Sequence, residues 1–303
     1  MILAVTGGTG FVGSHLLPLA VAQGYSVRAL ARRPQPPQPG VAWIAGDLAE
    51  PGALCEGVDA VVHIAGTINA RDRAGFDAGN VAGTASIVAA ARAAGVRRFV
   101  HVSSLAAREP GLSDYGASKA AAEDVMRTAG LDAAIVRPPG VYGPGDRETL
   151  PVFQMVARGL AVLPGPGRFS LIEVGDLAAV LLRVAASDRH GLAEVDDGHG
   201  GYSHAELALA IGDALGRRPR LLPLSTGVLR LGAGVATAVA KLRREMPKLS
   251  RDRARYLAHP DWTADPTLAL PSAIRGEAVP LADGLARTVA WYRAQGWLAP
   301  ARL

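Results

Sequence analysis

The sequence lacks a second cysteine and is poor in aromatic and charged residues. Because Cys55 is the single cysteine of the 303 residues, no disulfide forms within the chain, and a disulfide-stapled secreted scaffold is excluded. Hydrophobic residues make up 49% and charged residues 19%, which excludes a disordered chain and provides a sizeable core. The segment Ile2–Thr6 already has the composition of a core strand, so we expect no signal peptide and a cytoplasmic protein.

The balance of charge is mildly basic, with 32 lysines and arginines against 27 acidic residues and a net charge of +5. The basic residues include two clusters, one at Arg217, Arg218 and Arg220 and the other at Lys241, Arg243 and Arg244. No aromatic residues interleave them, as binding of single-stranded nucleic acid would need. We interpret both clusters as solvated surface and expect no nucleic-acid partner. The seven histidines and the cysteine show no metal-ligand spacing, so no metal site is expected.

One long segment, Leu221–Ala240, is almost wholly apolar. Pro223, Ser225, Thr226 and the central Arg230 argue against a membrane-spanning helix there. We predict a helix that is buried or covers a pocket, and a contact with a second subunit or with a membrane surface stays open.

Short apolar runs alternate with helical patterns in the first half of the chain. The runs are rich in Val, Ile and Ala and apolar on both faces, as buried parallel strands are: Ile2–Thr6, Tyr25–Ala31, Val41–Ala45, Ala60–Ile64, Arg98–Ser103 and Leu131–Arg137. Helical stretches lie between them, each followed by a glycine at the place of a C-cap: Phe11–Gln23, Phe76–Ala94 and Asp114–Ala129. This alternation predicts an α/β fold of the Rossmann type, with a doubly wound parallel sheet.

The regular alternation of strand and helix patterns ends at about residue 140, where proline and glycine cluster at Pro138–Gly145 and Pro164–Gly167. Irregular segments then separate the helical patterns Asp176–Ala186, Ser203–Leu215, Thr226–Glu245 and Leu281–Gln295. We therefore predict two domains. The doubly wound sheet takes residues 1–140 with parts of 170–195, and the remainder of 141–303 forms a smaller, mostly helical C-terminal substrate lobe.

A glycine-rich segment, Thr6–Gly13, follows the first predicted strand and opens the first predicted helix. Its spaced glycines permit a tight turn and let a pyrophosphate approach the backbone. The free N–H groups and the dipole of the first helical turn favour an anion at the same place. The strand–loop–helix context predicts a dinucleotide site, with candidate contacts at Gly7, Thr9, Gly10, Phe11, Val12 and Gly13.

The end of the second predicted strand bears on the choice between NAD and NADP. Sites that prefer NAD place an acid there for the ribose hydroxyls, yet no Asp or Glu occurs between Ser26 and Gly46. Arg32 and Arg33 stand where a 2′-phosphate would need positive charge, and a guanidinium binds phosphate in a fork. We expect NADP rather than NAD, with solvated surface arginines as the alternative.

Asp47 and Leu48, after the third predicted strand, are candidate contacts for the adenine. Two roles for Asp47 stay open at this stage. Its carboxylate suits the adenine amine as a hydrogen-bond acceptor, and it equally suits the cap of a short helix near Pro51.

Polar side chains follow the fifth predicted strand, which ends in Ser103 and Ser104. Tyr115 comes eleven residues after Ser104 and Lys119 four residues later, a spacing that puts the last two on one helix face. An ammonium beside a phenol favours the phenolate and is expected to lower the pKa of Tyr115. Such a phenol gives a proton to a carbonyl oxygen or takes one from an alcohol. A serine at the carboxyl edge of the neighbouring strand can hydrogen-bond the same oxygen, at the edge where doubly wound sheets bind ligands.

Together these motifs resemble the extended, or closely related atypical, short-chain dehydrogenase/reductases. The glycine spacing is similar to the TGxxGxxG pattern of the extended group. Further landmarks of the family have counterparts at His63–Gly66, Asn80–Thr84, Arg137–Asp146, Ile172–Ala178 and Asp283–Tyr292. The resemblance is dense up to about residue 180 and thin between about 190 and 280.

The resemblance implies a role for each member of a Ser-Tyr-Lys triad. Tyr115 would be the general acid/base, Ser104 would orient the carbonyl, and Lys119 would hold the nicotinamide ribose and tune Tyr115. Ser103 is the alternative for the serine, because the family pattern only favours the second position.

The family resemblance also implies further cofactor contacts, at Ala65 and Gly66 after the fourth predicted strand and at Pro138 and Val141 after the sixth. A homodimer is suggested by the family alone.

The resemblance leaves two chemistries open, hydride exchange with a substrate and the redox-neutral reactions of nucleotide-sugar epimerases and dehydratases. The sugar enzymes typically carry Asn three residues after the arginine that ends the sixth strand, where this chain has Gly140. The segment Arg137–Pro144 resembles instead the hydroxysteroid-dehydrogenase and dihydroflavonol-reductase-like members.

We therefore expect an NADP-dependent oxidoreductase that acts on the carbonyl or alcohol of a small, apolar substrate entering between the two lobes. The apolar segment Leu221–Ala240 favours such a substrate. The alternatives are a nucleotide-sugar epimerase or dehydratase and a non-catalytic NADP-binding subunit resembling the accessory subunit of respiratory complex I.

Overall fold

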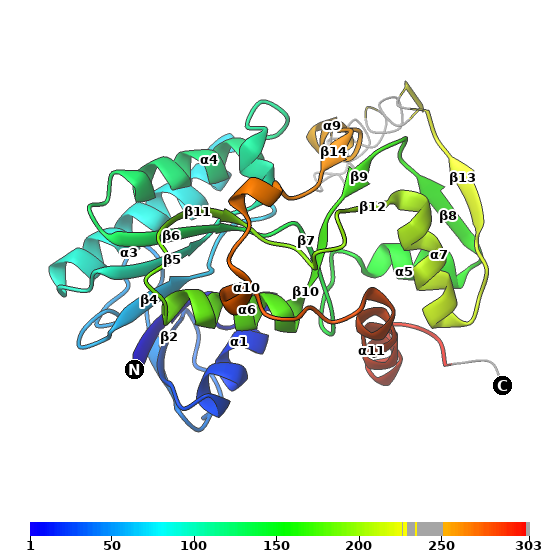
Figure 1. The fold of residues 1–303 in the computed structure, drawn as a ribbon. Helices are drawn as coiled ribbons and strands as arrows, with labels where there is room; N and C mark the ends of the chain where they lie inside the picture. The colour runs from blue at the N-terminus through cyan, green and yellow to red at the C-terminus, as the bar shows by residue number, and fades with distance from the viewer. Residues whose placement is uncertain (226, 229–233, 235–250, 301–303) are drawn as a thin grey trace. The chain divides into compact units, whose positions relative to one another are not determined.

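The computed structural model describes residues 1–225, 227–228, 234 and 251–300, which are drawn in colour in Figure 1. The chain divides into two compact units. Unit 1 comprises Met1–Pro138, Val174–Val195 and Asp265–Glu277, and unit 2 comprises Pro139–Glu173, Asp196–Ala264 and Ala278–Leu303. The helix predicted over Thr226–Glu245 lies almost entirely outside the described residues, and the basic cluster Lys241, Arg243 and Arg244 lies wholly outside them. Among the described helices, none combines the length and apolar composition that crossing a bilayer requires.

Unit 1 is built on a seven-stranded parallel sheet with the order β11-β6-β5-β4-β1-β2-β3. The strands are β1 (Ile2–Thr6), β2 (Ser26–Ala31), β3 (Val41–Ala45), β4 (Ala60–His63), β5 (Arg98–Val102), β6 (Asp132–Arg137) and β11 (Gly191–Glu194). The order reverses between β1 and β4, so the Rossmann-type, doubly wound α/β fold is confirmed. The predicted strands are also confirmed, and β11 is an additional edge strand.

Helices cover both faces of this sheet, as Figure 1 shows. On one side α1 (Phe11–Ala22) packs against α6 (Val174–Ala185), and on the other α3 (Gly83–Ala93) packs against α4 (Asp114–Arg127). The predicted helix Phe76–Ala94 is confirmed, although it starts earlier and contains a π-helical turn: α2 (Arg73–Asp77), the π-helical turn at Ala78–Ala82 and α3 follow one another directly. A short 3-10 helix at Leu105–Arg108 connects β5 towards α4, and unit 1 also holds α10 (Ser272–Arg275).

The burial of the central strands of unit 1 explains why their sequences are continuous apolar runs. Val61, Val62, Phe99 and Val100 of β4 and β5 are fully buried, because helices close both faces of these central strands. Helix α4 begins where Ser113 accepts a hydrogen bond from the Gly116 N–H at 3.0 Å. This cap sets where the helix starts, and so where its first turns lie beside the end of β5.

Unit 2 combines helices with small sheets of two or three short strands. The described helices are α5 (Leu150–Ala157), α7 (His204–Leu215), α9 (Arg251–Leu257) and α11 (Leu281–Ala294). The sheets pair β7 (Gly140–Tyr142) with β10 (Leu171–Glu173), β8 (Leu160–Leu163) with β13 (Arg220–Pro223), and β9 (Arg168–Phe169) with β12 (Tyr202–Ser203) and β14 (Asp261–Trp262). The core of this unit is built around Phe153 and Tyr292, whose rings meet edge to face.

A buried ion-pair network ties the carboxyl ends of β5, β6 and β11 to α4. Arg137, at the end of β6, donates from Nε and Nη2 to the two carboxylate oxygens of Glu123, each at 2.7 Å. Arg137 also reaches Glu194 at 3.2 Å, and Ser103 donates to Glu123 at 2.5 Å. Both carboxylates are fully buried. The network therefore fixes α4 against the strand ends that carry the predicted triad.

We expect Arg137→Met to lower the free energy of unfolding by about 3–5 kcal/mol, because two buried carboxylates would lose their guanidinium partner. The matched control is Arg127→Met, which removes a second partner of Glu123. The Arg127 side chain is 48% exposed, so its loss should cost less than about 1 kcal/mol. Urea unfolding at neutral pH measures both variants, and equal losses would contradict this account of the network.

Candidate active site

The glycine loop between β1 and α1 leaves no room for side chains. Gly7 has a φ of +74°, and a Cβ there would lie 2.7 Å from the Ala65 nitrogen. A Cβ on Gly13 would lie 2.1 Å from the Gly7 carbonyl oxygen. The loop closes on itself through the Gly10 N–H, which donates to the Gly7 carbonyl at 2.9 Å. The bare backbone at the N-terminus of α1 fits a pyrophosphate, since unpaired N–H groups and the helix dipole favour an anion there.

The other predicted contacts of the loop lie on the same turn. Thr9 and Gly10 are exposed, while Phe11 and Val12 are half-buried in the first turn of α1. Ala65 and Gly66 follow the end of β4 after one intervening residue, and Ala65 donates its N–H to the Thr6 hydroxyl at 3.2 Å. The structure thus brings the ends of β1 and β4 together beside the loop.

The predicted phosphate and adenine contacts follow β2 and β3. Arg32 and Arg33 are both exposed and form no salt bridge within the described part of the chain. Asp47 accepts hydrogen bonds from the N–H groups of Ala49 and Glu50 at 2.9 and 3.0 Å, so its carboxylate caps a turn. Leu48 packs against α3 at Gly83.

The two contacts predicted after β6 belong to different units. Pro138 ends the first segment of unit 1 and accepts a hydrogen bond from the Leu105 N–H at 3.0 Å. Val141 lies in β7 of unit 2, opposite Ile172.

The structure separates the two candidate serines. The Ser103 hydroxyl donates to Glu123 and belongs to the buried ion-pair network. The Ser104 hydroxyl is hydrogen-bonded to that of Tyr115 and accepts the Ala106 N–H at 3.1 Å, so it also caps the short 3-10 helix. Only the Ser104 hydroxyl, of these two, meets the phenol.

Tyr115 and Lys119 lie one turn apart on α4, as predicted, but the pKa of Tyr115 moves against the expectation. Burial raises the pKa of Tyr115, and the hydrogen bond with Ser104 offsets part of that rise. The expected lowering by Lys119 is therefore wrong for this structure. The Lys119 ammonium instead donates to the Val102 carbonyl at 2.7 Å.

Burial also lowers the pKa of Lys119 to about 8, against the opposing effect of the Glu123 carboxylate. Lys119 thus remains mainly charged at pH 7, and its ammonium lies close to Gly66.

A hydrogen-bonded chain beneath the site was missed from the sequence. The Thr6 hydroxyl bonds His63 Nδ1 at 2.7 Å, and His63 Nε2 bonds the Thr84 hydroxyl at 3.1 Å. The Thr84 hydroxyl donates in turn to the carbonyl of Asn80 at 2.6 Å, so His63 fits the chain as a neutral ring protonated on Nε2. The signals in the sequence were the family-like segments His63–Gly66 and Asn80–Thr84, which do not show that their side chains bond each other.

The Asn80 side chain joins the loop after β4 to α4. Its oxygen accepts the Thr67 N–H at 2.7 Å, and its amide donates to Thr67 and to Ser118 at 3.0 and 2.8 Å. These bonds occur at the π-helical turn, a form of helix often found at functional sites.

His101 on β5 is buried beside His63, with ring centroids 5.5 Å apart. Neither ring nitrogen of His101 has a hydrogen-bond partner among the described residues. Burial and the nearby Lys119 charge lower the pKa of His63 to about 3, and burial lowers that of His101 well below its usual 6.5.

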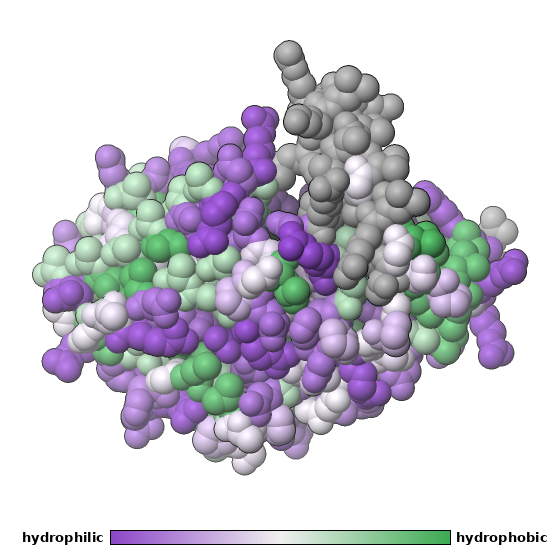
Figure 2. Space-filling view, turned by 90° about the horizontal axis from the view of Figure 1, so that it is seen from above, coloured by the Kyte–Doolittle hydropathy of each residue, from purple (hydrophilic) through white to green (hydrophobic). Residues whose placement is uncertain are grey.

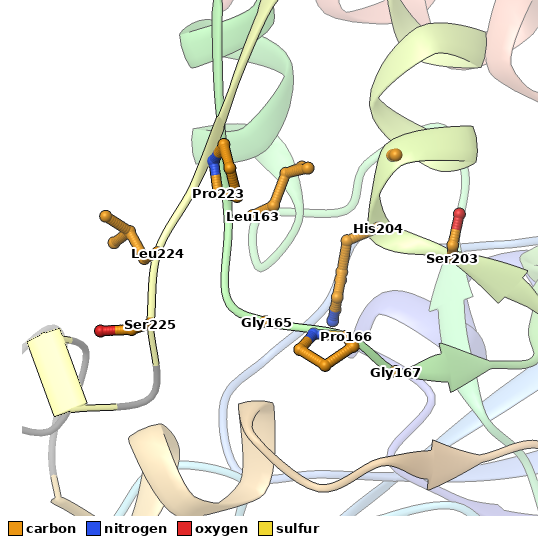
Figure 3. Close-up of a pocket in the computed structure, with 10 residues that line it drawn as sticks. Leu163, Gly165, Pro166, Gly167, Ser203, His204, Pro223, Leu224 and Ser225 are labelled. Carbon is orange, nitrogen blue, oxygen red and sulfur yellow. The ribbon is translucent and has the colours of Figure 1, made fainter.

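Unit 2 contains a cavity of about 520 Å³ (Figure 3). It is lined by the segment after β8, the start of α7 and the end of β13. The lining is largely apolar, with Leu163, Pro166, Pro223 and Leu224, and His204 points into it towards Pro166. Such a lining suits an apolar group with few polar contacts.

Comparison with known proteins places these features in a family. A sequence model of the NAD-dependent epimerase/dehydratase family matches residues 3–195. A ceramide reductase of Caulobacter vibrioides is 42% identical over 98% of this chain and 96% of its own length.

Solved structures share the fold. The dTDP-glucose 4,6-dehydratase DesIV of Streptomyces venezuelae, solved with NAD, is 27% identical, with a TM-score of 0.75 and full coverage of both chains. A human epimerase family protein solved with NADPH is 22% identical, with a TM-score of 0.74, and the match covers 96% of this chain and 99% of that one.

The buried side chains of His63 and His101 make the free energy of unfolding depend on pH. Unfolded histidines take a proton near pH 6.5, whereas the folded protein keeps both rings neutral. The free energy of unfolding should therefore fall as the pH drops below 6.5, by about 1.4 kcal/mol per pH unit for each histidine.

We expect His101→Leu to remove one histidine's share of this slope and to stabilise the protein at pH 7 by about 1 kcal/mol, because an unpaired buried donor disappears. His190→Leu, at an exposed histidine of unit 1, is the control and should leave the slope unchanged. Urea unfolding at pH 7, 6 and 5 measures the slope, and an unchanged slope in His101→Leu would contradict the account.

Proposed function

Because the chain belongs to the NAD-dependent epimerase/dehydratase family, we propose that this NAD(P)-dependent oxidoreductase of the short-chain type reduces a ketone of a ceramide-type lipid to an alcohol, with NADPH as donor. The observation that carries the proposal is the 42% identity to a ceramide reductase over nearly the whole chain. The matched region extends beyond residues 3–195 and includes most of unit 2. Unit 2 is the part of the chain that we propose determines which class of substrate binds.

The chemistry of the lipid class narrows the reacting group. A ceramide-type lipid is an amide of a fatty acid and a long-chain base, and a ketone on the base is a carbonyl that accepts a hydride readily. The apolar cavity of unit 2 supports the same class, since an alkyl chain needs such a lining. We accordingly propose unit 1 as the NADP-binding domain and unit 2 as the substrate-binding domain.

The triad suits a reduction in which a proton is delivered to the carbonyl oxygen. The nicotinamide of a bound NADPH would supply the hydride for the carbonyl carbon. Tyr115 gives its phenolic proton to the oxygen, while Ser104 donates a hydrogen bond to that oxygen and orients it. The phenolate that remains would keep the hydrogen bond with Ser104, the one group among the described residues that lowers the pKa of Tyr115 against burial. Lys119 lies one helical turn away, and Glu123 helps to keep its ammonium protonated.

The cofactor would be held by the backbone of the glycine loop, where Gly7 and Gly13 leave the necessary space. Thr9, Gly10, Phe11 and Val12 present the first turn of α1. Ala65, Gly66, Pro138 and Val141 are the further contacts, and Asp47 with Leu48 would border the adenine. Lys119 would also bind the nicotinamide ribose.

A nucleotide-sugar dehydratase is the second candidate, supported by the full-length match to DesIV at 27% identity. Gly140 argues against a dehydratase, because the asparagine side chain expected of the sugar enzymes is missing at this position. A Cβ on Gly140 would lie 3.2 Å from the end of the Leu171 side chain, so a larger residue at this exposed position would require a small shift of Leu171.

The first test of the function assays NADPH consumption with a ceramide-type ketone. We expect turnover by the native protein, a loss of about 100-fold or more in kcat for Tyr115→Phe, and retained NADPH binding. Near-native turnover by Tyr115→Phe would contradict the proposed acid.

The two serines provide the matched pair for this assay. Ser104→Ala should lower kcat about 100-fold, since it removes a hydrogen bond to the reacting oxygen. Its loss of the cap on the Ala106 N–H should lower the free energy of unfolding by about 1 kcal/mol or less. Ser103→Ala should retain kcat within about tenfold but lower the free energy of unfolding by about 1.5–3 kcal/mol, through loss of the bond to Glu123. The reverse result would assign the role to Ser103.

The preference for NADPH is tested by replacing Arg32 and Arg33 together with alanine. We expect NADPH to bind about tenfold or more weakly, because charge-assisted bonds to the 2′-phosphate are lost, while NADH binding stays within about threefold. Titration with each nucleotide measures both affinities. An equal loss for the two nucleotides would overturn the assignment of these arginines.

A further inference from the structure

The β8–β13 ribbon of unit 2 has one face in the core and one in solvent. Ala161, Leu163 and Leu221 belong to the core side. Residues paired in a parallel register point to the same face, so Leu160 lies beside Arg220 and Val162 beside Leu222 on the other side. There Leu160 is 43% exposed and Val162 38%. Figure 2 shows apolar residues gathered on the side where Figure 1 places β8 and β13.

A cluster of arginines borders this apolar strip. Arg158 follows α5, Arg217 and Arg218 precede β13, and Arg220 begins it; all are exposed. The cluster is compact, because a Cβ on Gly159 would lie 3.2 Å from the Arg217 guanidinium and the Arg220 N–H donates to the Gly159 carbonyl at 2.8 Å. No salt bridge to these arginines occurs within the described ranges. The docking face comprises Leu160, Val162 and Leu222 with these arginines.

We propose that the docking face binds a membrane surface that contains anionic phospholipids. Aliphatic side chains enter the acyl boundary, and arginines next to them meet the phosphate headgroups. A second copy of the chain fits less well, because a two-fold interface would bring arginines against arginines with no acidic partner on the face. Nucleic acid fits less well, because no aromatic ring is present for a base to stack on.

The proposal depends on the proposed function for its purpose, since a ceramide-type substrate resides in a bilayer. It rests on a different observation, the exposed aliphatic strip beside arginines that form no salt bridge with any described residue, and can be tested without substrate.

The experiment is flotation of the full chain with vesicles, either of phosphatidylcholine alone or mixed with phosphatidylglycerol. We expect binding to the mixed vesicles that weakens with salt. Replacing Arg217, Arg218 and Arg220 together with glutamine should weaken partitioning about 100-fold, because each arginine near an anionic surface contributes about fivefold.

A second variant tests the apolar part of the face. Leu160→Glu combined with Val162→Glu should reduce vesicle binding at least about tenfold, because apolar area no longer leaves water. The control is Leu209→Glu, an exposed leucine of α7 near Glu206 and Asp213, which should bind as the native protein does. Thermal unfolding confirms that each variant is folded.

The proposal would be overturned if the native protein did not float with the mixed vesicles, or if the folded variants bound as the native protein does. It would also be overturned if the face variants changed from dimer to monomer, because the face would then be an interface with a second copy. Turnover of a short-chain, water-soluble ketone separates this outcome from the function. If the native protein turns over this ketone but does not bind the mixed vesicles, docking alone is refuted. If the native protein binds the vesicles but does not turn over the ketone, the function alone is refuted.

Discussion

The buried pair of Arg137 and Glu123 is the interaction on which the geometry of the site depends. Glu123 lies one helical turn after Lys119, which lies one turn after Tyr115, so the position of its carboxylate fixes the phase of that face of α4. The same carboxylate accepts from Ser103, the neighbour of Ser104. One ion pair thereby sets the distance between the strand that carries the serine and the helix that carries the phenol. Its charge also opposes the effect of burial on Lys119 and keeps the ammonium protonated near pH 7.

The two buried histidines beneath the site are both uncharged. His63 stays neutral between two threonine hydroxyls, and His101 stays neutral without any partner among the described residues. A protonated histidine there would face the Lys119 ammonium in a medium that does not screen it. The two neutral rings therefore fill the sheet without adding a second positive charge beside Lys119.

The sequence allowed the Rossmann architecture to be predicted because buried parallel strands are long apolar runs with few alternatives. The strands of unit 2 were not predictable in this way, since pairs such as Arg168–Phe169 and Tyr202–Ser203 are too short to show a period. The π-helical turn inside the helix predicted over Phe76–Ala94 was not predictable, because Asn80 there bonds Thr67 and Ser118, contacts that exist only in the tertiary structure. The spacing of Tyr115 and Lys119 could be recognised in the sequence. The pKa of Tyr115 depends on burial, and the difference between Ser103 and Ser104 depends on the hydrogen bond from Ser103 to Glu123, so neither was predictable.

The central claim is net reduction of a ketone, and the fate of the hydride tests it most directly. The measurement is mass spectrometry of the product formed from a ceramide-type ketone and NADPH that carries deuterium at the transferable position. The account predicts one deuterium on the new carbinol carbon and one oxidised cofactor per product. Conversion of a nucleotide sugar with the deuterium still on the cofactor, and no reaction of the lipid ketone, would contradict it.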